Sequence, residues 1–527
     1  MDHFIIVPDK CAIGIEFGST RIKAVLIDEH YQPIASGAHL WENQLNDGIF
    51  TYSHSQILDG MQACFRALQK DVIEKTGRPL TTVGAMGISG MMHGYLALDK
   101  EDNFLVPFRT WRNTTTEESA EKLTNLFGFH VPHRWSVVHL YQAMLNKENH
   151  LPRIRYLTTL SGYIHYLLTG QRILGVGEAS GMMPIAANGQ DYDPHMMAQM
   201  NQLISEEGLP YRLEDILPRV GQAGEMGGHL TAAGAKLLDP TGSLQPGIPF
   251  AMPEGDAGTG MVATNCVAPG TGNVSAGTSI FAMVVLQRPL SSAYPEIDMV
   301  TTPDGKPVAM VHCNSCTSDL DEWAALFGQF AAAAGHPIDK SALYQLLYRS
   351  ALDGKADGGG MVAFNYLAGE PITRTFEGRP LFVRLPDTKL ELGTFMRVHL
   401  YSALATLTLG MDTLRKEKVS IRQIVGHGGL FKTKEVGQRL MAAALQTPVT
   451  VMATAGEGGE WGMALLAAYS RESPSLSLAD WLSQKVFSQM DQYTLSPDPA
   501  DVAGFQKYLN AYTRALPVEQ AAIASMG

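Results

Sequence analysis

Two short segments, one in each half of the chain, combine a glycine with two small hydroxyl residues. Gly18-Ser19-Thr20 lies within the run from Gly14 to Asp28, and Gly277-Thr278-Ser279 lies within the run from Gly272 to Leu286. Because β-rich residues stand on both sides of each glycine, both runs predict hairpins. Glycine lets a backbone approach a phosphate closely, and the neighbouring hydroxyl and amide groups can donate to its oxygens. Two such tips suit one polyphosphate, although Gly, Ser and Thr are also ordinary hairpin residues.

The candidate general base is Asp256, which lies in the glycine-rich stretch from Gly255 to Gly260. Phosphoryl transfer to a hydroxyl needs a base for that hydroxyl, together with positioning and charge neutralisation. The flanking glycines would leave the carboxylate open to a substrate. The same sequence suits an Asp that caps a helix or a turn, and the residues alone favour neither interpretation. Gly258-Thr259-Gly260 imitates a dinucleotide-binding loop, but no clear strand precedes it.

The chain contains no Walker pattern, so any nucleotide must bind by another geometry. Glu16 stands on the predicted strand just before the first tip, where a carboxylate can hold Mg²⁺ through water. As a bare observation, Glu16 could equally be a charge on an edge strand.

Four further residues are candidates for contact with a polyol. Met92 and His93 follow a predicted strand and offer soft apolar surface and a hydrogen-bonding imidazole. Trp111 offers a flat face for a sugar, and Asn113 offers an amide. A lone His is more often structural, and a Trp more often belongs to the core, so these alternatives stay open.

Length and composition describe a globular protein with several domains. The chain has 527 residues, 45% of them hydrophobic, and this length predicts roughly two to four domains. A net charge of -12 argues against nucleic acid or an anionic membrane as the main partner. Because no segment has the length of a membrane span or the pattern of a secretory signal, we expect a cytoplasmic protein. Five cysteines, including the lone pair Cys313 and Cys316, fit reduced thiols.

Helical and β-like stretches alternate in both halves of the chain. A helical pattern and a strand follow the first hairpin, at residues 55–75 and 83–88, and residues 109–185 are mainly helical in pattern. Helices at 318–334 and 395–414 and a strand at 421–425 follow the second hairpin. Residues 240–253, rich in Pro and Gly, are predicted to connect the halves. This order predicts an α/β duplication with a cleft between the halves as the natural ligand site.

From about Cys11 to Tyr469 the chain resembles the FGGY family of carbohydrate kinases, within the wider superfamily of sugar kinases, Hsp70 and actin. The two hairpins resemble the family's phosphate loops. Ser89 to Gly94 is similar to the Gly-Gln-Met-His-Gly substrate segment of xylulokinases, and Gly255-Asp256 resembles the segment with the catalytic base. Segments that resemble family segments near the nucleotide are Tyr366 to Glu370 with Gly378-Arg379, Gly428-Gly429 and Gly456 to Ala468.

The resemblance implies an α/β fold of two ribonuclease H-like, actin-like ATPase domains with an interdomain cleft. Residues 11–257 would bind the sugar and carry the first phosphate loop, and residues 258–527 would carry the second loop and bind adenosine. It further implies ATP and Mg²⁺ as cofactors, with Glu16 at the metal and Asp256 as the catalytic base. The implied substrate-binding residues are Met92, His93, Trp111, Asn113 and Asp256. The implied ATP-binding residues are Gly18, Ser19, Thr20, Lys23, Gly277, Thr278, Ser279, Gly428 and Gly429.

The chain departs from the family pattern at three places. The family usually has Asp where this chain has Glu16, which changes the reach of the side chain toward Mg²⁺. Many members carry an Asp near Trp111, where this chain has Asn113. After Gly429 the usual small or amide residues give way to Leu430-Phe431-Lys432-Thr433. The sequence around the first hairpin and Trp111 resembles a divergent ribulokinase-like branch.

We therefore expect an ATP- and Mg²⁺-dependent kinase that phosphorylates a ketopentose at its terminal hydroxyl, L-ribulose before D-xylulose. Two alternatives stay open: an actin-like or Hsp70-like ATPase, and a sugar-sensing protein without kinase activity. Met92-His93 and Asp256 count against the first, and the negative charge counts against a DNA-binding sensor. We expect a small-molecule sugar and ATP as partners, no nucleic acid and no membrane, and a homodimer is left open.

Overall fold

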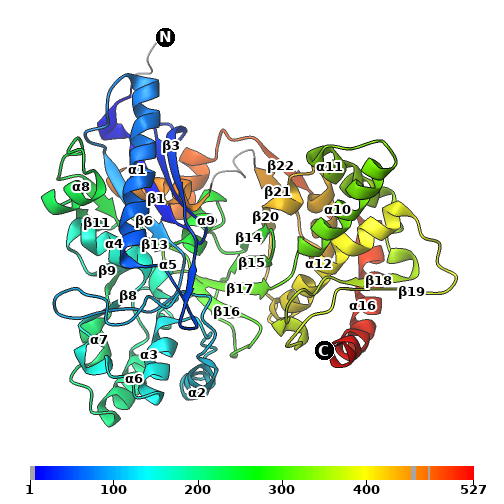
Figure 1. Ribbon diagram of the computed structural model, residues 1–527, viewed down its shortest axis with the longest axis horizontal. Helices are drawn as coiled ribbons and strands as arrows, with labels where there is room; N and C mark the ends of the chain where they lie inside the picture. Colours follow the sequence, from blue (N-terminus) through cyan, green and yellow to red (C-terminus); the bar gives the residue numbers. More distant parts are fainter. Residues whose placement is uncertain (1–5, 453–457, 473–474, 527) are drawn as a thin grey trace. The chain divides into compact units, whose positions relative to one another are not determined.

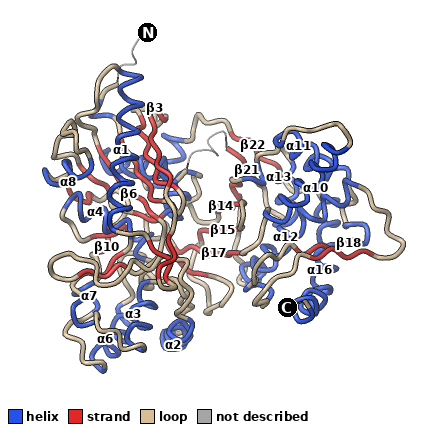
Figure 2. Tube along the Cα trace, in the orientation of Figure 1, coloured by secondary structure: helices blue, strands red, loops and turns tan. Residues whose placement is uncertain are grey.

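The computed structural model describes residues 6–452, 458–472 and 475–526, which form two compact units (Figure 1). The first unit comprises Met1–Ala268, Asp298–Val308 and Glu457–Gln489, and the second comprises Pro269–Ile297, Ala309–Gly456 and Met490–Gly527. Each unit has a mixed sheet with helices packed around it (Figure 2). Two sheet-containing α/β units confirm the predicted fold class.

The first sheet has the strand order β11-β12-β6-β1-β2-β3, and β13 also pairs with β6. Its central strands β1 and β6 are buried along their whole length. Strand β1 runs antiparallel to β2, with Glu16 opposite Lys23, and parallel to β6, with Glu16 opposite Ser89. The strands are β1 (Ala12–Phe17), β2 (Arg21–Ile27), β3 (Pro33–Leu40), β6 (Ala85–Gly90), β11 (Met226–His229), β12 (Pro249–Ala251) and β13 (Glu254–Gly255).

Helices cover this sheet and extend the unit. Helix α1 begins at a capping box, in which the Ser53 side chain accepts from the Gln56 N–H and the Gln56 side chain accepts from the Ser53 N–H. The helices are α1 (His54–Thr76), α2 (Glu117–Phe127), α3 (Ser136–Leu145), α4 (Leu160–Thr169), α5 (Val176–Ala179), α6 (Pro194–Glu206), α7 (Leu213–Ile216), α8 (Ala232–Leu238), α9 (Asp256–Ala263), α14 (Gly459–Glu472) and α15 (Leu478–Trp481). Smaller strands are β4 (Gln44–Asn46), β5 (Ile49–Thr51), β7 (Leu96–Leu98), β8 (Tyr156–Thr158), β9 (Ile173–Gly175), β10 (Arg219–Gly221) and β16 (Asp298–Thr301).

Helix α14 comes late in the sequence but belongs to the first unit, where it packs against β1, β6 and α9. Its Trp461 is fully buried, and the indole N–H donates to the carbonyl oxygen of Tyr31 at 3.0 Å. A helix from late in the sequence therefore covers the central strands of the first sheet.

Within the second unit, the sheet repeats the pairing pattern of the first, in the order β17-β15-β14-β20-β21-β22. Strand β14 runs antiparallel to β15 and parallel to β20, as β1 does to β2 and β6. The strands of this unit are β14 (Thr271–Ala276), β15 (Ile280–Val285), β17 (Pro307–Cys313), β18 (Met361–Phe364), β19 (Leu381–Arg384), β20 (Gln423–His427), β21 (Val449–Met452) and β22 (Gln492–Leu495). Its helices are α10 (Ser318–Ala333), α11 (Lys340–Ser350), α12 (Leu392–Lys416), α13 (Val436–Leu445) and α16 (Pro499–Ser525).

A buried ion-pair cluster fastens helix α16 to the second unit. Asp501 of α16 pairs with Arg397 of α12 at 3.4 Å and with Arg439 of α13 at 2.5 Å. Arg397 and Asp501 are both buried, so each charge depends on the other for compensation.

Three expectations about the chain's organisation meet a different structure. The predicted boundary between residues 257 and 258 falls inside α9, and the first unit continues to Ala268. Residues 240–253 include β12, so this stretch is part of the first sheet. Gly258-Thr259-Gly260 is helical within α9, so it does not form a dinucleotide-binding loop. The cysteines Cys313 and Cys316 are buried free thiols, as predicted from the cysteine content of the chain.

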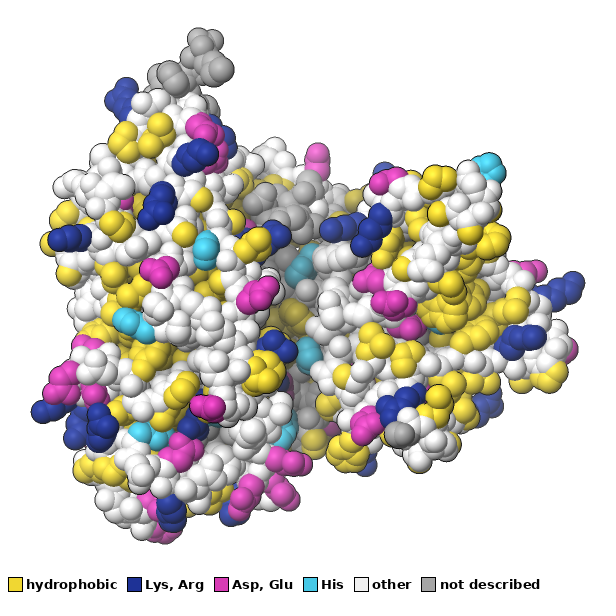
Figure 3. Space-filling model, viewed as in Figure 1, with side chains coloured by type: hydrophobic (Ala, Val, Ile, Leu, Met, Phe, Trp, Pro, Cys, Tyr) yellow, Lys and Arg dark blue, Asp and Glu magenta, His cyan; other side chains and the backbone are white. Residues whose placement is uncertain are grey.

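Hydrophobic side chains gather on the face of the second unit shown in Figure 3, around α10 and α12. Leu326 and Phe330 of α10 are exposed hydrophobic residues. In the part of the chain that the structure describes, no helix combines the length and the apolar character needed to cross a bilayer.

Candidate active site

The first hairpin tip is held by three aromatic side chains. The Trp41 indole donates to the Gly18 carbonyl at 2.7 Å, and the Tyr52 hydroxyl donates to the Ser19 carbonyl at 2.5 Å. The Trp111 indole donates to the Ser19 hydroxyl at 3.1 Å. Trp41 and Tyr52 also stack, with ring centroids 4.1 Å apart. These contacts fix the backbone of the tip, so its conformation does not have to be organised by a ligand.

The second hairpin tip is fixed by the segment that leads into α10. The Gly277 carbonyl accepts from the backbone N–H of Thr317 at 3.1 Å and from its hydroxyl at 2.8 Å. The Thr278 carbonyl accepts from the Cys316 N–H at 2.9 Å. The side chain of Thr278 stays exposed, so each tip combines a rigid backbone with an exposed hydroxyl side chain, that of Thr20 in the first.

The predicted adenosine turn begins directly after β20. Gly428 has a φ of +97°, and a Cβ at this position would lie 2.5 Å from the carbonyl oxygen of Ala276 on β14. Both the backbone conformation and the close approach therefore require glycine. The turn is thus packed against the strand that carries the second tip.

Asp256 is the first residue of α9, so its side chain lies at the positive end of a helix. Its Oδ1 accepts hydrogen bonds from the backbone N–H groups of Met92 at 3.1 Å and of Ala257 at 2.9 Å. Burial raises the pKa of Asp256 above its usual value, although both bonds act in the opposite direction. A carboxylate with a raised pKa is a better proton acceptor than an ordinary Asp.

His93 directly follows Met92, the residue whose backbone N–H binds Asp256. It is buried with a φ of +69°, and its Nδ1 lies 3.2 Å from the carbonyl oxygen of Gly181. Because a carbonyl only accepts, Nδ1 carries the proton and Nε2 is left as an acceptor. Burial and the nearby Arg134 lower the pKa of His93 to about 3, so the imidazole is neutral at physiological pH.

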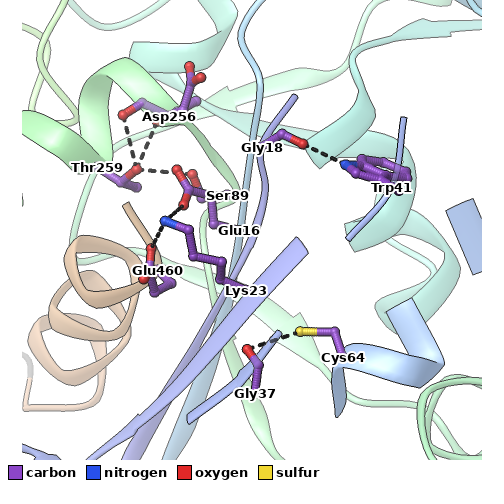
Figure 4. Close-up of polar contacts among 11 residues, drawn as sticks. Glu16, Gly18, Lys23, Gly37, Trp41, Cys64, Ser89, Asp256, Thr259 and Glu460 are labelled. Atoms are coloured by element: carbon purple, nitrogen blue, oxygen red, sulfur yellow. Dashed lines mark hydrogen bonds and ion pairs between the residues drawn. The ribbon is translucent and has the colours of Figure 1, made fainter. Parts of the chain in front are cut away.

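Three charged side chains meet behind the first hairpin (Figure 4). The Lys23 ammonium lies 3.3 Å from Glu16 on β1 and 3.1 Å from Glu460 at the start of α14. Burial raises the pKa of Glu16, as do the neighbouring charges of Glu460 and Asp256, while Lys23 lowers it. The site therefore groups two carboxyl groups around one cation, and Glu460 disfavours a charge on Glu16.

Helix α9 and strand β6 are joined in the same place. The hydroxyls of Ser89 and Thr259 lie 3.0 Å apart, and the Thr259 hydroxyl also lies 3.2 Å from the Gly255 carbonyl, to which it donates (Figure 4). This contact ties the segment before Asp256 to the strand beside Glu16.

These carboxylates fit Mg²⁺ by their chemistry. Magnesium prefers oxygen ligands and is usually held by one or two carboxylates together with phosphate and water oxygens. Glu16 supplies one buried carboxylate, and a dication beside it would favour the charged form that burial disfavours. Within the described ranges no three His, Cys, Asp or Glu side chains are grouped as a metal cage. The donor set therefore suits a metal that also needs oxygens from a ligand.

Trp111 and Asn113 make different contacts from those that a sugar platform needs. The Asn113 side chain is buried; its Oδ1 accepts from the Phe50 N–H at 2.9 Å, and its Nδ2 donates to the carbonyls of Phe50 and Thr110 at 2.8 and 2.9 Å. Trp111 is 40% exposed and bonds to Ser19. Asn113 thus holds its own loop, and Trp111 joins that loop to the first hairpin. A sugar contact remains a prediction for both.

The structure adds residues that the sequence patterns did not identify. Trp41 and Tyr52 hold the first tip, and Glu460 shares Lys23 with Glu16. No local signal marks these residues, because a Trp or Tyr after a strand and a Glu at a helix start are common. Only the fold brings them to the site.

Family models account for most of the chain. The model described as the FGGY family of carbohydrate kinases, N-terminal domain, matches residues 11–263. The corresponding C-terminal domain model matches residues 272–471. The two matches fall on the two hairpins and on Asp256.

Known proteins resemble the chain over nearly its whole length. A xylulose kinase of Haemophilus influenzae is 22% identical over 518 residues, which cover 96% of this chain and 98% of that protein. The crystal structure of a ligand-bound xylulose kinase from Lactobacillus acidophilus has a TM-score of 0.79 at 18% identity and covers 98% of this chain and 99% of its own. A gluconate kinase from the same organism has a TM-score of 0.77 at 18% identity, with 98% of each chain covered. These structures share the fold.

Proposed function

The chain belongs to the FGGY family of carbohydrate kinases, and we propose that it transfers a phosphoryl group from ATP to the terminal hydroxyl of a ketopentose. The sequence favoured L-ribulose over D-xylulose. We reverse this order and place D-xylulose first, because the relative from Haemophilus influenzae is a xylulose kinase. The family makes the chain a sugar kinase, and the particular sugar is our proposal.

The observation that carries the proposal is the pairing of a base with a polyol-binding segment. Asp256 combines a raised pKa with a hydrogen bond from the backbone of Met92, which directly precedes His93. Among the described residues, both side-chain bonds of Asp256 use Oδ1. Oδ2 is then the oxygen that takes the proton from the attacking hydroxyl. An actin-like ATPase has no need of this pair.

His93 orients the sugar in this proposal. Its neutral ring presents Nε2 as an acceptor, so a sugar hydroxyl can donate to it. Neutral His93 adds no positive charge next to Asp256, so it does not lower the basicity of the carboxylate. The sugar end that reacts would lie at Asp256 and the remaining hydroxyls nearer His93.

The hairpin tips bind the phosphates in this proposal. The backbone and hydroxyl groups of Gly18, Ser19 and Thr20 form one donor set, and those of Gly277, Thr278 and Ser279 form the other. Gly428 and Gly429 would hold adenosine. Glu16 would hold Mg²⁺, which neutralises phosphate charge when bound. Lys23, which lies directly opposite Glu16 in the β1–β2 pair, keeps Glu16 and Glu460 in place.

The test is a substrate comparison under fixed ATP and Mg²⁺. ADP release is measured with D-xylulose, L-ribulose, D-ribulose and L-xylulose, with glycerol and gluconate as controls. One ketopentose should exceed its epimers in kcat/KM, because a site that hydrogen-bonds particular hydroxyls leaves buried groups unpaired with the wrong isomer. Glycerol or gluconate outrunning every ketopentose would overturn the substrate class. ATP hydrolysis that no sugar stimulates would contradict kinase activity itself.

A further inference from the structure

A second acidic side chain lies beneath the catalytic base and takes no part in the chemistry described above. Glu178 of α5 is completely buried. Neither of its carboxyl oxygens has a hydrogen-bond partner among the described residues. A buried carboxylate without a partner is among the most costly groups that a protein can contain, so this residue calls for a physical explanation.

The surroundings of Glu178 disfavour a negative charge. The acidic groups Asp256 on α9 and Glu254 on β13 both raise the pKa of Glu178, and burial raises it further. The hydroxyls of Thr159 and Ser161 lie close enough to lower the pKa as hydrogen-bonding neighbours, but they lie 3.3 Å from each other and neither has the geometry of a full hydrogen bond to Glu178. Among the described residues, Tyr192 is a further titratable group that faces Glu178.

Cations on the neighbouring elements are engaged elsewhere. Arg219 of β10 is exposed and pairs with Glu225 at 3.6 Å. Arg134 pairs with Asp298 of β16. Within the described ranges, Glu178 therefore has no counter-ion to repay the cost of a buried charge.

Glu178 also packs against Gly255, the residue that precedes Asp256. A Cβ placed on Gly255 would lie 2.3 Å from Oε2 of Glu178 and 2.3 Å from Cγ of Met92. Glu178 and Met92 therefore occupy the space that a side chain at position 255 would need, so only glycine fits there without a shift of its neighbours. Glu178 and Met92 thus both pack closely against the segment that sets the position of Asp256.

The contact is reciprocal. The side chain of Glu254, two residues before Asp256, accepts from the backbone N–H of Glu178 at 2.9 Å. Three residues further along from Glu178, the carbonyl of Gly181 holds the His93 ring. The short segment from Glu178 to Gly181 thus contacts both the base segment and the imidazole.

We propose that Glu178 is a positioning residue for Asp256: it remains protonated and uncharged in the folded protein, and its side chain, wedged against Gly255, fixes the start of α9. A charge on Glu178 would repel the Asp256 carboxylate, whereas the protonated acid supports it without electrostatic cost. The inference rests on the proposed function only for its kinetic consequence, because the wedge and the bound proton are properties of the fold.

The first test measures protonation without any activity. The ordinary pKa of a Glu side chain is 4.5, and the folded protein raises the pKa of Glu178 well above that value. Above pH 4.5 the unfolded chain therefore loses a proton that the folded protein keeps, so rising pH destabilises the native state. Glu178→Gln has no such proton. The Tm of this variant relative to the natural protein should therefore climb steadily from about pH 5 to about pH 8. A Tm difference that stays constant over this range would show that Glu178 is charged in the fold and would overturn the proposal.

The second test measures the wedge by a double-mutant cycle in Tm. Gly255→Ala should lower Tm, and the same change should cost less in a Glu178→Ala background, because part of the clash is then gone. Met92 remains in contact, so the recovery is partial. Strictly additive effects would mean that the two residues are not coupled and would refute the wedge.

The third test concerns catalysis with the best sugar of the natural protein. Glu178→Ala should reduce kcat by about 10- to 100-fold through a displaced base and leave the KM for ATP unchanged. Glu178→Gln should retain kcat within about threefold and leave the acid limb of the kcat/KM profile in place. Normal kcat in Glu178→Ala, or a lowered acid limb in Glu178→Gln, would refute the positioning role. If the natural protein phosphorylates no sugar, the proposed function fails, and the two Tm tests still decide this inference.

Discussion

The backbone N–H of Met92 donates to Oδ1 of Asp256 across 3.1 Å, and this one bond joins two segments that lie 164 residues apart in the sequence. One segment carries the polyol-binding candidates and the other carries the proposed base. Because the donor is a backbone group, only a proline at position 92, which has no N–H, would remove the bond directly. The position of the base therefore depends on the conformation of the loop that follows β6, where His93 has a positive φ.

Asp256→Asn should abolish most of the activity while preserving binding. The amide keeps the shape of the side chain but accepts no proton, and loss of a general base costs on the order of 10² to 10⁴ in rate. Single-turnover phosphorylation and equilibrium binding of ATP and sugar are the measurements. Near-normal turnover at saturating substrates would remove Asp256 from the role of base.

The pH profile should have an acid limb above the value for an ordinary Asp. Burial raises the pKa of Asp256 above 3.8, and the base works only when it is deprotonated, so kcat/KM rises with pH through this limb. His93 has a pKa of about 3 and stays neutral across the working range. The limb should therefore keep its midpoint in a His93→Gln variant. A midpoint that moves with His93 would assign the titration to the imidazole.

Glu16→Gln should raise the Mg²⁺ concentration that gives the half-maximal rate and leave the KM for the sugar nearly unchanged. A hard cation prefers the charged carboxylate oxygen to an amide. Glu460→Gln is the matched control, because Glu460 also pairs with Lys23 but is not the proposed metal residue. If the two variants needed the same Mg²⁺ concentration for the half-maximal rate, Glu16 would not be a metal residue. Measuring the Tm of each variant would identify any loss of folding.

Trp111→Phe should weaken the binding of ATP more than the binding of the sugar. The change keeps an aromatic face and removes the indole N–H that donates to Ser19 at 3.1 Å. Loss of one hydrogen bond is worth about 0.5–1.5 kcal/mol, which corresponds to a rise of about 2- to 12-fold in the KM for ATP. Steady-state kinetics with each substrate varied in turn give the answer. A rise confined to the sugar KM would instead support the predicted contact of Trp111 with the sugar.

Asp501→Asn should destabilise the second unit strongly. The change leaves the buried Arg397 guanidinium without its counter-ion and weakens the pair with Arg439. Breaking a buried ion pair costs about 3–5 kcal/mol, and chemical denaturation should report a loss of that order. A loss below about 1 kcal/mol, typical of surface pairs, would show that solvent compensates the charge.

Much of the fold was accessible from local sequence. The hairpins at Gly18 and Gly277 and the long helix α12 follow directly from β-rich runs around glycine and from an apolar helical period. The boundary between the domains was not accessible, because α9 continues through residue 258 and no break in composition marks Ala268.

The chemistry of single residues was accessible only in part. Asp256 stands out by its flanking glycines, and the structure gives it two backbone donors. The Asn113 side chain bonds to the backbone of Phe50 and Thr110, and the sequence did not predict these contacts. Glu178 gave no signal at all, because burial without a partner depends on contacts between distant segments and leaves no pattern in the chain.

The position of α14 has a consequence for biosynthesis. During synthesis the first sheet emerges with β1 and β6 long before residues 457–489 leave the ribosome. Until then the surface that later receives Trp461 stays uncovered, and the nascent amino-terminal half exposes apolar strand faces to other chains. Truncation after the second hairpin would leave the same surface open, so a fragment that ends there is expected to aggregate. Chaperones acting on this protein would therefore meet the unfinished amino-terminal half.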